Sequence, residues 1–277
     1  MGTTGIQYLF RTTADSKLLC YAWFQAMHTR VDILISSSTD EQGCRHVVDE
    51  AASVIHEIEL KANCFDPHSE LSRVNRLAAT RIVPLSEDLR NALQQCLDYH
   101  RLTDGLFDIT IDSQSFSPKT GTEVSLSTEG ISFAQPGIKL NMSGFIKGYA
   151  LDRVGDLLRR EGFESALVSL GTSSVMAIGH QHGSDGWRMR LPGAEGSIVL
   201  HDECLTTSGN DSPGRHHIIN PKTGHYVEGM STVSVVTESA TVGEVMSTCL
   251  FIAPPAIRQT LIKQFKVRHW YTSPPID

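Results

Sequence analysis

Two kinds of hydrophobic pattern alternate along this chain, and together they limit the folds that it can adopt. Short runs rich in β-branched and aromatic residues, such as LLCYAWFQAMHTRVDILIS at residues 18–36, are typical of strands. Longer segments repeat apolar residues every three or four positions. In HVVDEAASVIHEIELKAN, residues 46–63, this repeat predicts a helix with one face in the core. No internal repeat is visible, so we expect one fold that mixes helices and strands.

The same patterns predict the other elements. Ser86, followed by two acidic residues, can cap a second helix, and Gly105 lies beyond its end. A third helix continues through Asp152 to Arg160 and is ended by Gly162. Further strands are predicted at SALVSLG, WRMRLP, SIVLHD, HHIIN, STVSVVT and VRHWYTS, and further helices from about residue 241 and across PAIRQTLIKQF.

Length and charge narrow the functional classes. The 277 residues can bury a substantial core, so size is no obstacle to an enzyme. A formal net charge of −7 argues against a general nucleic-acid binder, because such proteins gather Lys and Arg to neutralise phosphates. No apolar stretch approaches the length of a membrane span, and the first residues lack the apolar run of a secretory signal. We therefore expect a cytoplasmic protein without a membrane span.

The segment NMSGFIKGYALD, residues 141–152, places two glycines and a lysine between a predicted strand and a predicted helix. Gly144 and Gly148 let the backbone approach a ligand closely, and the helix N-terminus directs its amides toward the turn. Lys147 adds a cation, so the segment suits a phosphate or pyrophosphate. A plain connection with a solvated lysine explains the same residues equally well. The segment matches neither the Rossmann nor the P-loop pattern, so neither fold is predicted.

Oxygen-bearing side chains recur in SATVGEVMSTCLF, residues 239–251. If this segment is helical, Glu244 shares a face with Ser247 and Thr248, three and four residues later. Carboxylate and hydroxyl oxygens are hard ligands that suit Mg²⁺ better than zinc. With one charged side chain, such a site needs carbonyls, waters or a phosphate to complete it. The alternative is an amphipathic helix with its polar face in water.

Two adjacent histidines precede a predicted turn in GRHHIINPKTGH, residues 214–225. On a strand, His216 and His217 point to opposite sides, so only one of them faces a given site, where it can act as a general base. A zinc-dependent hydrolase would need both, with a third ligand from His180, His182 or His201. Two adjacent histidines without a third nearby ligand make a poor zinc site.

Several segments, in this order, resemble the ApbE-like flavin transferases, the FAD:protein FMN transferase family. FQAMHT is similar to the family's F-x-A-M-G-T, with His28 where glycine is usual, and FDPHSELSRVN and GLFDIT match the segments that follow. NMSGFIKGYALD resembles D-L-G-G-I-A-K-G-Y-A-V-D, and ALVSLGTSS stands where A-L-V-N-L-G-G-D belongs. TTSGN, HHIINPKTG and SATVGEVMSTCLF resemble A-T-S-G, H-H-I-L-D-P-x-T-G and the metal-binding helix S-A-x-x-A-D-A-L-S-T-A-L-F. The resemblance covers most of the chain from residue 24 on.

The resemblance implies an α+β fold of mixed, mainly antiparallel sheets with packed helices. It also implies one two-lobed unit over residues 1–277, with residues 1–20 as a peripheral N-terminal extension. FAD would lie across a cleft, beside Mg²⁺ held by the Gly144 carbonyl, Glu244, Ser247 and Thr248. Flavin contacts are implied for Met27, Phe65, Phe107, Asp108, Asn141, Lys147 and Ile219. His217 matches the catalytic base.

The chemistry implied by the resemblance is phosphoryl transfer. A threonine hydroxyl of an acceptor flavoprotein, activated by His217, would attack the FMN-side phosphorus of FAD, and AMP would leave. Mg²⁺ and Lys147 would neutralise charge on the reacting oxygens. Water in place of the threonine would give FMN and AMP, the reaction of an FAD pyrophosphatase.

This sequence also departs from the family pattern. The departures are Asn141 and Asn220 for aspartates, Glu244 for the metal-binding aspartate, Thr172-Ser173 for Gly-Asp, and a shorter segment between Ser208 and His217. Lost negative charge weakens Mg²⁺ binding more directly than flavin binding. The rival hypothesis is therefore a divergent FAD-binding protein that does not modify a partner.

Overall fold

The computed structural model describes residues 5–13, 17–181, 183–191, 196–210 and 217–273. Its centre is an eight-stranded sheet, in the order β1-β2-β3-β6-β7-β10-β13-β14, in which each neighbouring pair is antiparallel. The strands are Gln7–Thr12 (β1), Leu18–Ala26 (β2), Thr29–Ser37 (β3), Ala166–Leu170 (β6), Ser174–Ile178 (β7), Glu203–Gly209 (β10), Thr232–Thr237 (β13) and His269–Ser273 (β14). The sheet confirms the α+β class with mainly antiparallel pairing.

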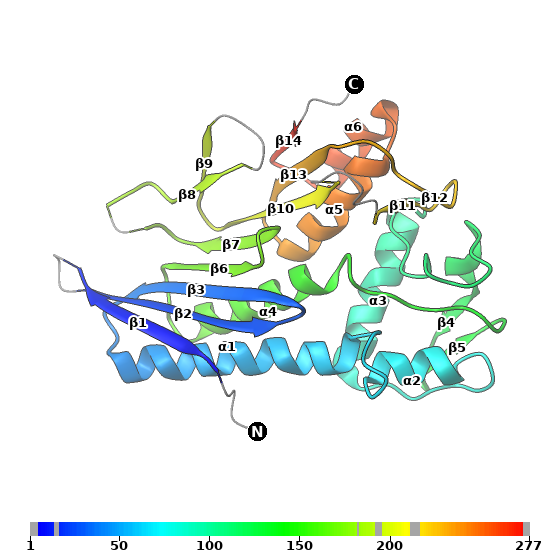
Figure 1. Ribbon diagram of the computed structural model, residues 1–277, viewed down its shortest axis with the longest axis horizontal. Coiled ribbons are helices and arrows are strands. Elements are labelled where there is room, and N and C mark those ends of the chain that lie inside the picture. The colour runs from blue at the N-terminus through cyan, green and yellow to red at the C-terminus, as the bar shows by residue number, and fades with distance from the viewer. Residues whose placement is uncertain (1–4, 14–16, 182, 192–195, 211–216, 274–277) are drawn as a thin grey trace.

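In Figure 1 the helices lie below the sheet and to its right. The α-helices in the described residues are Glu41–Ala62 (α1), Glu70–Leu77 (α2), Glu87–Leu102 (α3), Ile146–Arg160 (α4), Ala240–Ile252 (α5) and Pro255–Gln264 (α6). α1 packs against β2 and α4, and α5 packs against α4 and β10. α2 and α3 lie beyond the sheet, on the right of Figure 1. The smaller elements are the 3₁₀ turn Thr120–Glu123 (η1) and the hairpins Val124–Leu126 (β4) with Ile131–Phe133 (β5), Trp187–Arg190 (β8) with Ser197–Leu200 (β9), and Ile219–Asn220 (β11) with His225–Tyr226 (β12). In the same view, the β8–β9 hairpin lies above the sheet.

The helical predictions are confirmed, with adjusted ends. The apolar stripe of α1 is buried at Val47, Val48 and Ile55, as its periodicity predicts. Ser86 caps α3 by accepting a hydrogen bond from the Leu89 amide at 3.4 Å. The third predicted helix, α4, begins at Ile146, so its first turn lies inside the glycine-bracketed segment.

The strand predictions need two refinements. The run at residues 18–36 divides into β2 and β3, joined by a two-residue turn at Met27 and His28 with φ of 50° and 57°. Positive φ at both positions is the conformation that a tight hairpin turn requires. In HHIIN only Ile219 and Asn220 pair as a strand, so His217 precedes the strand rather than lying on it, and His216 lies outside the described residues.

The helix α2 has no counterpart among the predictions. Its sequence ELSRVNRL has only 8 residues, which is shorter than the window of about 11–18 residues over which apolar periodicity is read. Ser69 nevertheless caps it, accepting a hydrogen bond from the Ser72 amide at 3.0 Å.

Buried apolar residues form two main cores, and α4 contributes to both. Tyr149 joins the core of α2, α3 and α5, whereas Leu151 and Val154 join the core between α1 and the sheet. The start of α4 is therefore fixed from two sides. None of the helices in the described ranges combines the length and apolar character needed to cross a membrane.

Candidate functional site

A cleft of about 630 Å³ opens beside the β2–β3 turn and the start of α4. Its volume falls within the range of about 300–1,000 Å³ that is usual for small-molecule sites. It is lined by every predicted site residue except Phe65 and Ser247, namely Met27, Phe107, Asp108, Asn141, Gly144, Lys147, His217, Ile219, Glu244 and Thr248. Residues more than 200 positions apart in the sequence thus share one cavity.

The first turn of α4 brings its lysine close to α5 because Gly148 has no side chain. A Cβ atom at Gly148 would lie 2.3 Å from the carbonyl oxygen of Ala240 and 2.7 Å from Cγ of Glu244. Such distances are far below normal van der Waals contact. The second glycine of the segment therefore serves close helix packing. Gly144 is exposed and lines the cleft, where its backbone is open to a ligand.

Asp152, one helical turn further along α4, fastens the N-terminus of α5. Its carboxylate accepts hydrogen bonds from Ser239 Oγ at 2.7 Å, from the Ala240 amide at 2.7 Å, and from the Thr241 amide and hydroxyl at 3.0 and 2.6 Å. A carboxylate at this position also interacts favourably with the positive end of the helix dipole. The spacing between Lys147 and Glu244 is thus fixed by packing and by capping.

Glu244 is almost fully buried at the floor of the cleft. Burial raises the pKa of its carboxyl group, while the charge of Lys147 and a hydrogen bond from Ser174 act in the opposite direction. Ser174 Oγ donates that hydrogen bond to Oε1 of Glu244. The carboxylate is therefore held by a hydroxyl donor and lies within the electrostatic influence of Lys147.

Hydroxyl groups gather next to this carboxylate. Ser208 Oγ lies 2.7 Å from Ser247 Oγ and 3.1 Å from Thr248 Oγ1, and both Ser208 and Thr248 line the cleft. Ser247 is fully buried and reaches the cleft only through Ser208. Together with Glu244, these groups offer oxygen atoms, a donor chemistry that fits a hard cation such as Mg²⁺. Ser208 was not among the predicted residues, although it belongs to the TTSGN segment.

Asn141 is engaged by its neighbours. Its side-chain oxygen accepts hydrogen bonds from the amide and the hydroxyl of Ser143, at 2.9 and 2.6 Å, and its Nδ2 donates to Asp112 at 2.7 Å. Asp112, which was not predicted, also lines the cleft. It places a carboxylate beside the position at which the sequence replaces the family's aspartate by asparagine.

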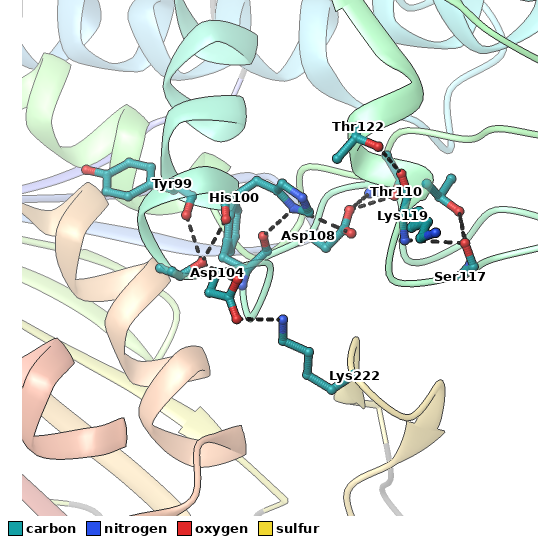
Figure 2. Close-up of polar contacts among 12 residues, drawn as sticks. Tyr99, His100, Asp104, Asp108, Thr110, Ser117, Lys119, Thr122 and Lys222 are labelled. Carbon is teal, nitrogen blue, oxygen red and sulfur yellow. Dashed lines mark hydrogen bonds and ion pairs between the residues drawn. The ribbon is translucent and has the colours of Figure 1, made fainter. Parts of the chain in front are cut away.

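Asp108 lines the cleft, and Figure 2 shows its carboxylate between Thr110 and His100. Its Oδ1 accepts hydrogen bonds from the amide and hydroxyl of Thr110, at 2.7 and 2.6 Å. Its Oδ2 is buried without a hydrogen-bond partner, and His100 Nδ1 lies 3.5 Å away. This oxygen is closed off from the cleft, and the ring of His100 is the polar group placed beside it. His100 was missed because the sequence offers no motif around it.

An ion pair links two walls of the cleft. Figure 2 shows Lys222, in the turn between β11 and β12, pointing to Asp104, with Nζ and Oδ2 3.0 Å apart. The hairpin that follows His217 is thereby tied to the loop that precedes Phe107 and Asp108. His217 itself is exposed, which leaves its side chain accessible to a group from another protein.

Phe65 lies outside the main cleft but lines an adjoining cavity of about 400 Å³. The two cavities share Met27, His28, Ser143 and Lys147. Phe65 is 63% exposed at this site, so its ring is available to stack on a planar group.

Among the described residues, the histidines of the zinc alternative do not gather at one site, because His217 lines the cleft whereas His180 and His201 do not. His180 and His201 stack on each other with ring centroids 6.3 Å apart, beside the ends of β7 and β10 that lie away from Ser208. Within the described residues, no group of three His, Cys, Asp or Glu side chains is placed to hold a metal ion. His182 and His216 lie outside the described residues.

The sequence model of the ApbE family matches residues 27–270. The chain belongs to the ApbE family. The FAD:protein FMN transferase of Klebsiella pneumoniae (strain 342) is 31% identical over 132 residues, which are 42% of this chain and 40% of that protein. The FAD:protein FMN transferase of Chlamydia pneumoniae is 26% identical over 229 residues, which are 70% of this chain and 72% of that protein.

Solved ApbE structures share the whole fold. Flavin transferase ApbE from Vibrio cholerae superposes with a TM-score of 0.79 at 17% identity, covering 98% of each chain. The apo form of the flavinyl transferase ApbE from Pseudomonas stutzeri gives a TM-score of 0.79 at 19% identity, covering 95% of this chain and 96% of that one. At this identity the likeness establishes the fold.

Proposed function

We propose that this ApbE-family protein transfers FMN from FAD to a threonine hydroxyl of an acceptor protein, with release of AMP and with Mg²⁺ required. The observation that carries the proposal is the convergence of His217, Lys147 and Glu244 on one cleft, in a chain of this family. An accessible base, a cation and a carboxylate are the groups that transfer of a phosphoryl group to a hydroxyl needs.

The residues divide the work by position. FAD would lie along the main cleft and the adjoining cavity, with aromatic contacts from Phe65 and Phe107 and further contacts from Met27 and Ile219. Asp108 would shape the wall of the flavin site, with its carboxylate held by Thr110 and lying beside His100. Lys147 stands at the junction of the two cavities, where its ammonium group can meet the pyrophosphate.

His217 takes the proton of the threonine hydroxyl as its oxygen bonds to the FMN-side phosphorus. The bond from this phosphorus to the bridging oxygen breaks, and AMP leaves with the electron pair. Lys147 stabilises the negative charge on the leaving phosphate. Mg²⁺ would add positive charge beside the same oxygens. The groups that would hold it are Glu244, Thr248 and the Gly144 carbonyl, and Ser247 would support the hydroxyl group of Ser208.

To test the proposal, the purified protein is incubated with FAD and Mg²⁺, with and without a candidate acceptor protein from the same cell. AMP release and flavin fluorescence in denaturing gels are then measured. We expect AMP and a fluorescent acceptor band, both abolished by His217→Ala. His201→Ala is the matched control, because His201 is exposed and lies outside the cleft.

Other outcomes assign other functions. FMN and AMP formed without a fluorescent acceptor would identify an FAD pyrophosphatase. Tightly bound FAD with neither product would identify the FAD-binding protein that the loss of carboxylates at Asn141 and Asn220 suggests.

A further inference from the structure

A chain of hydrogen bonds connects Lys147 with Glu244 inside the cleft. Lys147 Nζ donates to Ser173 Oγ, Ser173 Oγ lies 3.2 Å from Ser174 Oγ, and Ser174 Oγ donates to Oε1 of Glu244. The four side chains come from α4, from the β6–β7 turn, from the start of β7 and from α5. The contact joins three segments that are remote in sequence.

Lys147 at one end of this chain and Glu244 at the other fix the direction of each hydrogen bond between them. An ammonium group can only donate, and each serine hydroxyl has a single hydrogen. Because Ser174 gives its hydrogen to Glu244, it must accept in its bond with Ser173. Ser173 therefore accepts from Lys147 and donates to Ser174. Such an ordered chain strengthens each of its bonds, since each hydroxyl is polarised by its neighbour.

We propose that Ser173 and Ser174 are positioning residues that hold one oxygen of Glu244 and leave the other to bind a divalent cation. The proposal rests on the proposed function, because it assigns the metal to the same carboxylate. Glutamate is longer than aspartate, and an unrestrained carboxylate on the longer chain can rotate away from the cleft. Hydroxyl contact from fully buried Ser174 removes that freedom.

The packing around Glu244 supports this role. Gly148, adjacent to Lys147, lies directly against Cγ of Glu244, so the side chain passes over α4 before it reaches Ser174. Steric contact fixes its stem, and the hydroxyl fixes its head. Ser173 stands where the family pattern has aspartate. This chain therefore supports Glu244 by the neutral hydroxyl groups of Ser173 and Ser174.

The experiment measures Mn²⁺ binding to the full-length protein without FAD, by electron paramagnetic resonance of the free ion. We expect Ser174→Ala to weaken Mn²⁺ binding about 10-fold or more, as is usual when a group that orients a metal ligand is removed. Ser173→Ala should weaken binding as well, and the double variant should lose little more than Ser174→Ala alone. Ser173→Thr keeps a hydroxyl at a partly exposed position and should restore binding.

The matched control is Ser234→Ala. Ser234 is buried and its hydroxyl pairs with that of Thr207 at 2.7 Å, but it does not contact Glu244. A general packing effect would lower the melting temperature in both Ser234→Ala and Ser174→Ala, whereas loss of Mn²⁺ binding should be confined to the Ser173 and Ser174 variants.

Two results would overturn the proposal, and they can be told apart. If the serine variants bind Mn²⁺ as the unmodified protein does while AMP release persists, the positioning role is wrong and the transferase proposal stands. If the unmodified protein binds no Mn²⁺, the metal role of Glu244 fails, and the role of the serines fails with it.

Discussion

Replacing Gly148 by alanine should disturb both stability and the site. The added Cβ would meet the backbone oxygen of Ala240 at 2.3 Å and its carbonyl carbon at 2.6 Å. Normal contacts are about 3.5–4.0 Å, so α4 and α5 would have to separate by about 1 Å. Backbone atoms held by the cap at Asp152 cannot rotate away as a flexible side chain can.

The magnitude follows from two opposing effects. Overpacking of this kind typically costs about 1–3 kcal/mol. Alanine in place of glycine in a helix regains up to about 1 kcal/mol. The net loss in the free energy of unfolding therefore lies between about 0 and 3 kcal/mol, and its central range of about 1–2 kcal/mol corresponds to a fall of about 2–8 °C in melting temperature. Because Cγ of Glu244 is also displaced, Mn²⁺ binding should weaken in the same variant.

Gly155→Ala is the matched control, in the same helix two turns later. A Cβ there would meet Met176 at Sδ, 2.6 Å away, and at Cε, 3.0 Å away, which are atoms of a flexible side chain that can move. We expect its melting temperature to stay within a few degrees of the unmodified protein. Thermal unfolding followed by circular dichroism compares the two variants. Equal stability and equal Mn²⁺ binding in both would refute the idea that Gly148 sets the separation of α4 and α5.

Two further predictions concern stability. Asp152→Ala leaves four hydrogen-bond donors at the start of α5 without their acceptor. We expect the free energy of unfolding, measured with urea, to fall by about 2–4 kcal/mol, because one unsatisfied buried group alone costs about 1–3 kcal/mol. A fall smaller than that of a typical surface substitution would contradict this. Burial raises the pKa of Tyr99 from 10.0 to about 12, so the unfolded chain loses its proton first and stability falls as the pH rises from 10 to 12. Tyr99→Phe keeps the ring packed against Phe107 and Phe145 and should flatten that part of the melting-temperature profile, whereas an unchanged slope would show that other groups govern it.

Local signals in the sequence pointed to one part of the candidate site, whereas Met27, Phe65, Phe107, Asp108, Asn141 and Ile219 entered only through the resemblance to the family. The spacing of Glu244 and Thr248 follows from helical geometry, and the structure places both of them in the cleft. Lys147 was found in the same way, from glycines beside a helix start. Each of these inferences needed only residues within one turn of each other.

Contacts between remote segments could not be derived in this way. Ser174 meets Glu244 across 70 positions, and nothing in either segment indicates the other. His100 approaches Asp108 only because the loop after α3 turns back, and its partner is not visible as a motif. The turn at Met27 and His28 also escaped the strand prediction, because neither residue is glycine although both have positive φ.

The antiparallel pairing of β3 with β6 determines when the site can form during synthesis. Val31 pairs with Leu170, so the central part of the sheet cannot close until the chain has been made past Leu170. Contacts of such long sequence separation slow folding, because the entropy of closing the loop is lost before they form. β1 to β3 and α1 can assemble early, but Lys147 is connected to Glu244 through Ser173 and Ser174 only after α5 has emerged from the ribosome. The nascent chain therefore cannot acquire the complete cleft before α5 has been made.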